Sequence, residues 1–258
     1  MTTAAAHTFY LFVRVMRNLA RQPIWVVFFI IQPLFWLLLY SQLFERVVEL
    51  PGFRTNSYID FIAPGIAIMT AFFSGTWAGM GLIEDLDRGV VERFLATPAR
   101  RSAIVLSRTL QSAVTATLQA FIILVVALAL GATNGGALGW IVILAAAFLI
   151  AAGFAAMSNA IALLTRQEAT MIAIANFIGL PLLFFSSVLI ASSLIPGWMR
   201  TLSLGNPLEW SVRAARELVL LGSTDWGAIG LYLALLVAFA ASMSAFATWS
   251  FRAYQRTL

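Results

Sequence analysis

The chain has 258 residues, of which 61% are apolar, 10% are charged and none is cysteine. A soluble domain carries about a quarter charged residues, so this chain has too few charges to cover a soluble globule of its size. The composition therefore excludes a soluble enzyme, a disordered chain and a disulfide-stabilised scaffold.

Five long stretches without a charged residue locate the membrane spans. Each is at least 23 residues long, and a spanning helix needs about 20 apolar residues. The longest stretch, 109–165, has room for two helices because the glycine-rich cluster 131–136 provides a turn. The apolar runs are continuous and lack the alternation of a barrel strand. We therefore predict an all-α membrane protein, a single domain over 1–258 with six transmembrane helices at about 24–43, 59–82, 105–130, 139–164, 170–192 and 227–251.

The arginines set the orientation of these spans. With six spans, eleven of the 16 arginines share a side with both termini, and five lie on the other side. Because cytoplasmic loops carry the excess of positive charge, we expect a multi-pass protein with both termini in the cytoplasm.

An amphipathic helix is predicted over residues 8–22, before the first span. Apolar residues at helical spacing form one stripe, and the opposite stripe is basic, with Arg14, Arg17 and Arg21. This pattern is typical of a helix that lies in the cytoplasmic interface of the membrane. Such a helix serves either as a membrane anchor or as a lever that touches a cytoplasmic partner.

The most charged segment lies between the second and third predicted spans. Pro98 disfavours helical backbone at the preceding residue, so we predict a helix that ends there. An apolar ridge runs along one face of this helix, formed by Leu86, Val90, Phe94 and Leu95. A ridge of this kind beside mixed charges suits docking to another protein. The alternative is a solvated loop with ordinary positive-inside arginines, but such a loop needs no acidic cluster.

Residues 193–222 are too polar to span the membrane and too apolar for a plain loop. Asn206 is a predicted N-cap, and Pro207 follows at the first helical position. An apolar stripe then comprises Leu208, Val212, Ala215 and Val219. The other face carries Glu209, Arg213 and Arg216. We predict an amphipathic outer helix of about four turns, with a shorter piece before it that dips into the membrane and returns. The simplest role for this segment is a lid packed on the span ends.

The chain lacks the residue types of most catalytic and metal sites. All basic residues are arginine, which excludes a lysine-containing P-loop, and the sole histidine is His7. With no cysteine, this argues against a zinc site. The predicted span interiors contain no ionisable side chain, which argues against an ion-driven carrier or a hydrophilic channel. We predict no catalytic residue and no metal ligand, although a membrane-embedded enzyme such as a lipid-modifying transferase remains as a second class.

A recognisable pattern covers nearly the whole chain. It comprises the stretch 58–66 with Gly75 and Gly79, the segments 84–98 and 102–104, and Asn206-Pro207 followed by Arg213 and Gly222. This pattern resembles the membrane subunit, or permease, of type-2 ABC exporters, and most closely the daunorubicin-resistance-type branch. Residues 58–108 are the specific part of the resemblance, and elsewhere the match is mostly hydropathy.

The resemblance implies partners and a location. A permease of this kind pairs with a second copy or a homologue in the bacterial plasma membrane, and with two separate ATPase subunits. ATP and Mg would be bound by those subunits, so this chain would hold no cofactor. The expected substrate is a hydrophobic or amphipathic drug, lipid or glycolipid, and the alternative is a polysaccharide or other glycan.

The resemblance also implies roles for particular residues. The segment 84–98 would be the coupling helix, which sits in a groove of the ATPase subunit, and the N-terminal helix would be the connecting helix. Its candidate coupling residues are Glu84, Asp85, Leu86, Asp87, Gly89, Val90, Glu92, Arg93, Phe94, Leu95 and Pro98. The substrate path would lie at the protomer interface, along spans two and five. Its candidate residues are Met69, Phe72, Phe73, Asn176, Phe177 and Phe184.

Overall fold

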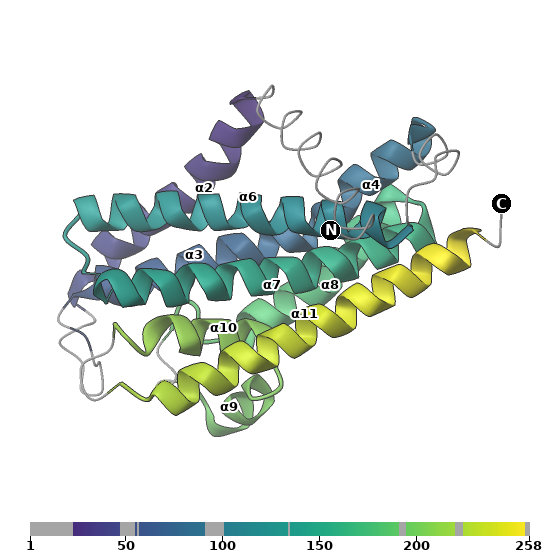
Figure 1. The fold of residues 1–258 in the computed structure, drawn as a ribbon. Coiled ribbons are helices and arrows are strands. Elements are labelled where there is room, and N and C mark those ends of the chain that lie inside the picture. Colours follow the sequence, from purple (N-terminus) through teal and green to yellow (C-terminus); the bar gives the residue numbers. More distant parts are fainter. Residues whose placement is uncertain are drawn as a thin grey trace.

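The computed structural model is a bundle of helices (Figure 1). It describes residues 23–46, 55, 57–90, 101–133, 135–190, 195–219 and 224–255, without the side chains of 23–30, 101–104 and 255. The described residues contain no strand, which confirms the predicted all-α class for this part of the chain. The helices are α2 (Pro23–Leu43), α3 (Tyr58–Thr76), α4 (Ala78–Asp87), α6 (Arg101–Ala129), α7 (Gly136–Thr165), α8 (Glu168–Phe184), α9 (Gly197–Ser203), α10 (Pro207–Arg216) and α11 (Trp226–Gln255).

Four helical stretches among the described residues are long and apolar enough to cross a membrane. They are Tyr58–Asp87, which joins α3 to α4, Val105–Ala129, Gly136–Thr165 and Trp226–Tyr254. These coincide with the second, third, fourth and sixth predicted spans. The first predicted span corresponds to α2, which has 21 residues. The fifth predicted span corresponds to α8, which ends at Phe184 after only 17 residues, a length of about 26 Å. The count of six spans therefore stays a prediction.

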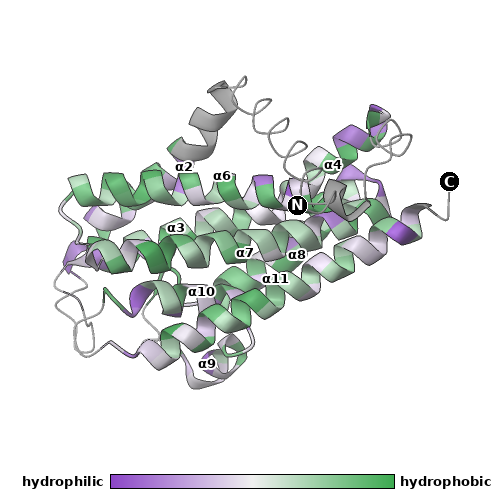
Figure 2. Cartoon of the chain, in the orientation of Figure 1, coloured by the Kyte–Doolittle hydropathy of each residue, from purple (hydrophilic) through white to green (hydrophobic). Residues whose placement is uncertain are grey.

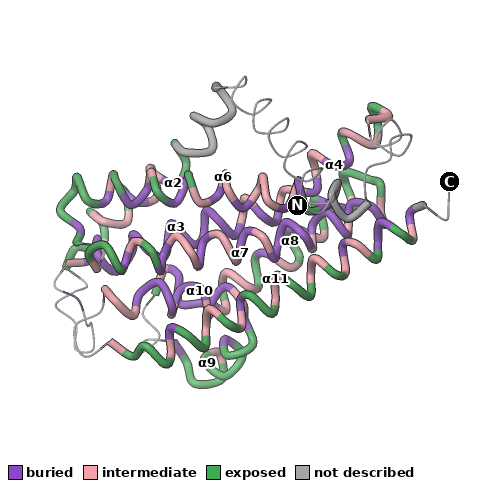
Figure 3. The backbone as a smooth tube through the Cα atoms, viewed as in Figure 1, coloured by how far each residue is buried: buried purple, intermediate pink, exposed green. Residues whose placement is uncertain are grey.

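Helices α3 and α7 form the centre of the bundle (Figure 3). Helix α7 packs against α3, α6 and α11, and α3 also contacts α2 and α10. The residues of α3 are buried without a gap from Tyr58 to Phe72. Few residues of α11 are buried by contrast, and its exposed side chains include Leu231, Val237 and Trp249. Figure 2 shows apolar residues on this outer surface as well as inside, as expected where lipid takes the place of water.

Two glycines allow the second span to lie directly against α7. A Cβ atom at Gly75 would lie 2.7 Å from the carbonyl oxygen of Ala151, and one at Gly79 would lie 2.5 Å from that of Ser158. No larger side chain fits at these distances. Both glycines are therefore points of close helix packing.

The two ends of the bundle carry different elements (Figure 1). The α6–α7 turn, α9 and α10 lie at one end, and α4 and the C-terminal end of α11 lie at the other. The predicted turn is made by three glycines with positive φ, at Gly131, Gly135 and Gly136. Asp60, in the first turn of α3, accepts hydrogen bonds from the backbone N–H and the hydroxyl of Thr133 at 2.6 and 3.0 Å. This carboxylate therefore ties the turn to the start of α3.

The structure corrects the helix predicted over 84–98. Helix α4 continues from the second span to Asp87, Arg88 caps it, and Gly89 has a φ of +65°. Glycine favours this left-handed backbone, which commonly ends a helix. The prediction took Pro98 as the stop signal and passed over Gly89. The chain is helical again at Val90, and residues 91–98 lie outside the described part.

Two other predicted elements have different outcomes. The interfacial helix over 8–22, with Arg14, Arg17 and Arg21, lies outside the described residues and stays a prediction. The outer segment contains two short helices, α9 and α10. Asn206 caps α10 as predicted, because its side chain accepts a hydrogen bond from the N–H of Leu208 at 2.9 Å, and Pro207 follows it. Helix α10 has 10 residues, about three turns rather than four.

Candidate functional site

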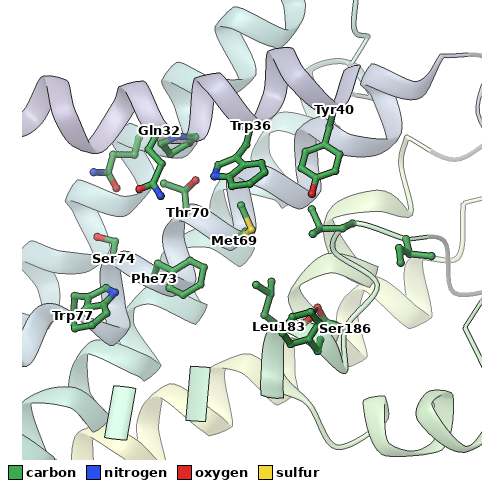
Figure 4. A pocket seen from close by; sticks show the side chains of 15 residues that line it. Gln32, Trp36, Tyr40, Met69, Thr70, Phe73, Ser74, Trp77, Leu183 and Ser186 are labelled. Carbon is green, nitrogen blue, oxygen red and sulfur yellow. Dashed lines mark hydrogen bonds between the residues drawn. The ribbon is translucent and has the colours of Figure 1, made fainter. Parts of the chain in front are cut away.

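A cavity of about 610 Å³ lies between α2, α3 and the end of α8. Figure 4 shows Gln32, Trp36 and Tyr40 pointing from α2 toward α3 and the end of α8. One residue of α6, Gln119, completes the wall. The lining residues are Gln32, Pro33, Trp36, Tyr40, Met69, Thr70, Phe73, Ser74, Trp77, Gln119, Leu183, Phe184, Ser186, Leu189 and Ile190.

The lining is largely aromatic and aliphatic, and it carries no acidic or basic side chain. Two of its hydroxyl groups are already used inside the protein. Thr70 Oγ1 donates to the carbonyl oxygen of Ile66 at 2.8 Å, and Ser186 Oγ donates to that of Leu183 at 2.6 Å. Apolar walls with a few polar groups are typical of sites for small organic ligands. The chemistry of this cavity therefore suits an apolar or amphipathic molecule.

Three of the six predicted path residues line the cavity: Met69, Phe73 and Phe184. Phe72 faces the core instead, where its ring lies 4.7 Å from that of Phe154, because neighbouring residues of a helix point about 100° apart.

The two remaining path residues lie outside the lining. The side-chain amide of Asn176 donates to the carbonyl oxygen of Ile172, one turn earlier in α8. Phe177 is 81% exposed. Phe72, Asn176 and Phe177 therefore lie outside the cavity that one protomer forms, and their part in a path at the protomer interface stays a prediction.

The contribution of α2 was missed by the sequence-based prediction. Gln32, Trp36 and Tyr40 lie four residues apart, so they share one face of α2. A signal was present in the sequence, because Gln32 is a polar residue in the middle of an otherwise apolar span. The ring of Trp36 stacks on that of Tyr40 at 5.4 Å, which holds this face in order.

One wall of the cavity is made of non-helical backbone. Helix α8 ends at Phe184, and the following residues to Ile190 form bends, although Ser186, Leu189 and Ile190 line the cavity. Backbone N–H and C=O groups that leave a helix need new hydrogen-bond partners, because apolar surroundings provide none. The question for this wall is which groups satisfy its backbone.

Helix α10 supplies those partners through three side chains. The side-chain amide of Asn206 donates to the carbonyl oxygens of Leu182 and Phe185 at 2.7 and 3.0 Å. Glu209 Oε2 accepts from the backbone N–H of Ser187 at 2.6 Å. Arg216 donates to the carbonyl oxygens of Ser187 and Val188. We call Asn206, Glu209 and Arg216, together with these backbone groups, the α10 network.

Arg216 also connects the wall to the start of α3. Its Nε donates to the carbonyl oxygen of Phe61 at 3.0 Å, and its guanidinium lies 3.7 Å from the centre of the Phe61 ring. Burial lowers the pKa of Arg216 to about 10, and the nearby Glu209 carboxylate opposes that shift. The side chain therefore remains charged at neutral pH. A Cβ at Gly65 would lie 2.7 Å from Arg216 Nη2, so only glycine leaves room for this contact.

The α10 network corrects the predicted outer helix. Leu208, Val212 and Ala215 are buried, as the apolar stripe predicted, and Arg213 Nε donates to Glu209 Oε1 at 2.6 Å. However, Glu209 and Arg216, which were placed on the opposite, charged face, are only 1% and 4% exposed. Sequence periodicity predicts that charged residues lie on the surface. It cannot reveal that backbone groups elsewhere in the fold need these side chains as hydrogen-bond partners.

The residues predicted to couple to a partner lie at the other end of the bundle. Asp85 pairs with Arg108 of α6, and Glu84 pairs with Arg88 at 2.6 Å on the surface. Leu86 packs against a cluster that includes Leu82 and Ile83, and Asp87 ends α4. Gly89 and Val90 follow it, and the remaining predicted members, Glu92, Arg93, Phe94, Leu95 and Pro98, lie outside the described residues.

A second break in a helix lies between the cavity and this end. Helix α3 ends at Thr76 and α4 begins at Ala78, with Trp77 between them. Ser158 Oγ of α7 donates to the carbonyl oxygen of Thr76 at 2.7 Å and accepts from the N–H of Gly79 at 2.9 Å. One serine therefore bridges the break, and Trp77 points into the cavity lining.

Comparison with known proteins identifies the family of this architecture. Residues 6–220 match the family model described as ABC-2 type transporter. A protein named as transport permease ycf38 from Cyanophora paradoxa is 32% identical over 211 residues, which are 81% of this chain and 73% of that protein. The daunorubicin resistance ABC transporter permease protein DrrB1 of Streptomyces coeruleorubidus is 25% identical over 256 residues, 98% of this chain and 87% of that protein.

Replacing Arg216 tests the α10 network. The change Arg216→Leu leaves three buried carbonyl oxygens without their donor, and we expect the free energy of unfolding to fall by about 3–5 kcal/mol. This difference is measured by unfolding the purified permease in detergent, either by heating or by titration with SDS. Arg46→Leu, at an exposed position, is the matched control and should change stability little. Equal stability of the two variants would contradict the assignment.

Proposed function

The chain belongs to the ABC-2 type transporter family, and we propose that it is the membrane subunit of an ATP-driven exporter. Its substrate is a hydrophobic or amphipathic molecule, such as a drug, lipid or glycolipid, which it moves out of the cytoplasm or the inner leaflet. The observation that carries this proposal is the uncharged, aromatic cavity between α2, α3 and α8.

The cavity supports a substrate of this class in two ways. Its volume of about 610 Å³ lies within the range of about 300–1,000 Å³ that is usual for small-molecule sites. Two of its lining residues, Phe184 and Ile190, are largely exposed, so it opens to the surface of the protomer. A polysaccharide would place its hydroxyl groups against side chains such as Pro33, Met69 and Leu183, which cannot bond them. The lining therefore favours an amphiphile over a glycan.

The relatives point to the same class of substrate. The Streptomyces relative is named for resistance to daunorubicin, and two Mycobacterium tuberculosis relatives, 22% identical, are named for resistance to doxorubicin. By analogy, we propose that this chain also handles drug-like amphiphiles. Whether its substrate is a drug or a lipid depends on contacts within the cavity.

The energy for transport comes from a separate subunit in this proposal. Permeases of this family pair with an ATPase subunit, and this chain contains no lysine for a P-loop of its own. We place ATP and Mg on two such subunits, and a second permease, either a copy or a homologue, beside this one. The transporter would then reside in the bacterial plasma membrane.

Helix α4 is the mechanical link between the ATPase and the cavity in this proposal. The ATPase subunit docks on the coupling segment 84–98, whose first four residues are the C-terminal end of α4. Helix α4 is tied to α6 by Asp85 and Arg108, and it begins directly after Trp77, a cavity residue. Movement of the ATPase subunits would therefore reach the cavity through Trp77. A substrate that binds one state of the bundle better than the other biases this switch.

Filling the cavity tests the proposed substrate site. The change Ser74→Trp places an indole in the cavity, and we expect ATP-dependent transport to fall by about tenfold or more, since 1.4 kcal/mol of lost binding is a factor of ten. The measurement is uptake of a fluorescent amphiphile into inside-out liposomes that contain the permease and its ATPase subunit. The control is Ser242→Trp, at an exposed position of α11. Unchanged transport by Ser74→Trp would rule out this cavity as the path.

Charging the predicted apolar ridge tests the docking of the ATPase. The double change Phe94→Glu and Leu95→Glu should detach the ATPase subunit and abolish transport, because buried charges without partners prevent docking. Co-purification of the two subunits and ATP-driven export are the two readouts. The amount of permease in the membrane, measured by immunoblot, should stay the same. Intact co-purification with normal export would exclude the ridge as the docking site.

A further inference from the structure

Tyr40 is a partly exposed residue of α2 whose hydroxyl is open to the cavity. Figure 4 shows its side chain pointing from α2 toward the end of α8, with the hydroxyl at its tip. This oxygen makes no hydrogen bond to a residue in the described part of the chain, and it is not closed off from solvent. A molecule that occupies the cavity can therefore reach it.

The ring that carries this hydroxyl is held in place from both sides. It stacks on the ring of Trp36 with the two centroids 5.4 Å apart, and on the ring of Phe44 at the same distance. Phe44 in turn contacts the ring of Tyr58 at the start of α3, with the centroids 5.9 Å apart. A polar group that is fixed before binding loses little conformational entropy when a ligand bonds it. Tyr40 is therefore a pre-organised hydrogen-bonding group.

The other polar side chains of the lining differ from Tyr40 in bonding or in place. The hydroxyls of Thr70 and Ser186 donate to carbonyl oxygens of their own segments. Gln32 and Ser74 lie near the opposite end of the cavity in Figure 4. Gln32 precedes Tyr40 by eight residues of α2, which is about 12 Å along the helix. Tyr40 thus offers a separate polar contact at the end of the cavity that α8 closes.

We propose that Tyr40 Oη donates a hydrogen bond to an uncharged oxygen of the transported molecule and selects for amphiphiles that carry such an acceptor. A phenolic hydroxyl is a better donor than acceptor, because its oxygen lone pair is shared with the ring. The acceptor is a carbonyl oxygen, as in a ketone, an ester or an amide. An anionic oxygen would be buried without a counter-charge, since the lining holds no basic side chain. This inference rests on the proposed function, which places the substrate in this cavity.

The consequence is discrimination between molecules of nearly the same shape. A positioned donor favours the molecule with an acceptor over its hydrocarbon analogue, because the hydrogen bond replaces the water that both groups lose on binding. For one neutral hydrogen bond we expect a factor of about ten in Kd. Removing the hydroxyl should abolish this factor and leave the binding of the hydrocarbon nearly unchanged.

The test compares 4-acetylbiphenyl with 4-isopropylbiphenyl, which has nearly the same shape but no carbonyl oxygen. The full-length permease is placed in phosphatidylcholine nanodiscs, and each compound displaces the fluorescent probe N-phenyl-1-naphthylamine. The Kd of the probe is measured separately for each variant and corrected for protein-free nanodiscs. Each compound enters the lipid to the same extent in every sample. A change in the ratio of the two Kd values between variants therefore reports a contact with the protein.

Two variants make the result specific to Tyr40. Tyr40→Phe removes the hydroxyl and keeps the ring that stacks on Trp36 and Phe44. We expect it to weaken binding of the ketone about tenfold relative to the hydrocarbon. Its melting temperature should not fall, because the hydroxyl bonds nothing in the described chain. The matched control is Tyr254→Phe, which removes a phenolic hydroxyl near the C-terminal end of α11, outside the cavity lining. This control should keep the wild-type ratio.

The outcomes separate the inference from the function on which it rests. The role of Tyr40 is overturned by an unchanged ratio in Tyr40→Phe, by an equal change in Tyr254→Phe, or by a lower melting temperature of Tyr40→Phe, which would show that the hydroxyl bonds the protein. The cavity then remains the proposed site, provided that Ser74→Trp weakens the binding of both compounds. Saturable binding that Ser74→Trp leaves unchanged, or the absence of saturable binding, overturns both the inference and the cavity as a substrate site.

Discussion

Backbone that leaves a helix inside an apolar bundle must find hydrogen-bond partners elsewhere, because neither lipid nor aliphatic side chains provide them. The segment after α8 is the clearest case in this protein. Its carbonyl and N–H groups are bonded by Asn206, Glu209 and Arg216 of α10. This single requirement accounts for the position of α10, for the need for glycine at Gly65 and for the shape of one cavity wall.

The cavity lies where two helices are interrupted. Trp77 marks the break between α3 and α4, which Ser158 bridges from α7. Ser186 belongs to the break after α8, which α10 bridges. In both cases a polar side chain of a neighbouring helix satisfies the freed backbone, and the residues at the break face the same space. Interrupted helices thus give a transporter a cavity with ordered walls and without charged residues in its lining.

Much of the fold could be predicted from the sequence, because gaps between charges locate apolar helices and Asn206-Pro207 is a strong start signal. The site was predicted less well. Hydropathy continues to residue 192 and does not reveal that α8 ends at Phe184, because bent backbone bonded by a neighbour can be as apolar as a helix. Periodicity placed Arg216 opposite the apolar stripe, whereas its partners lie 28 or more residues away along the chain. Local sequence patterns do not reveal hydrogen-bond partners that lie so far apart along the chain.

Helix α10 and its N-cap hold the non-helical wall of the cavity by hydrogen bonds. Hydrogen–deuterium exchange of residues 185–190, in the permease in nanodiscs, tests this role of α10, because exchange reports local opening of amides. We expect slow exchange in the wild-type protein and faster exchange in Glu209→Ala, which removes the acceptor for Ser187, with α7 unchanged. Equal exchange of this segment in the two proteins, or wild-type exchange as fast as in the α6–α7 turn, would contradict this role of α10.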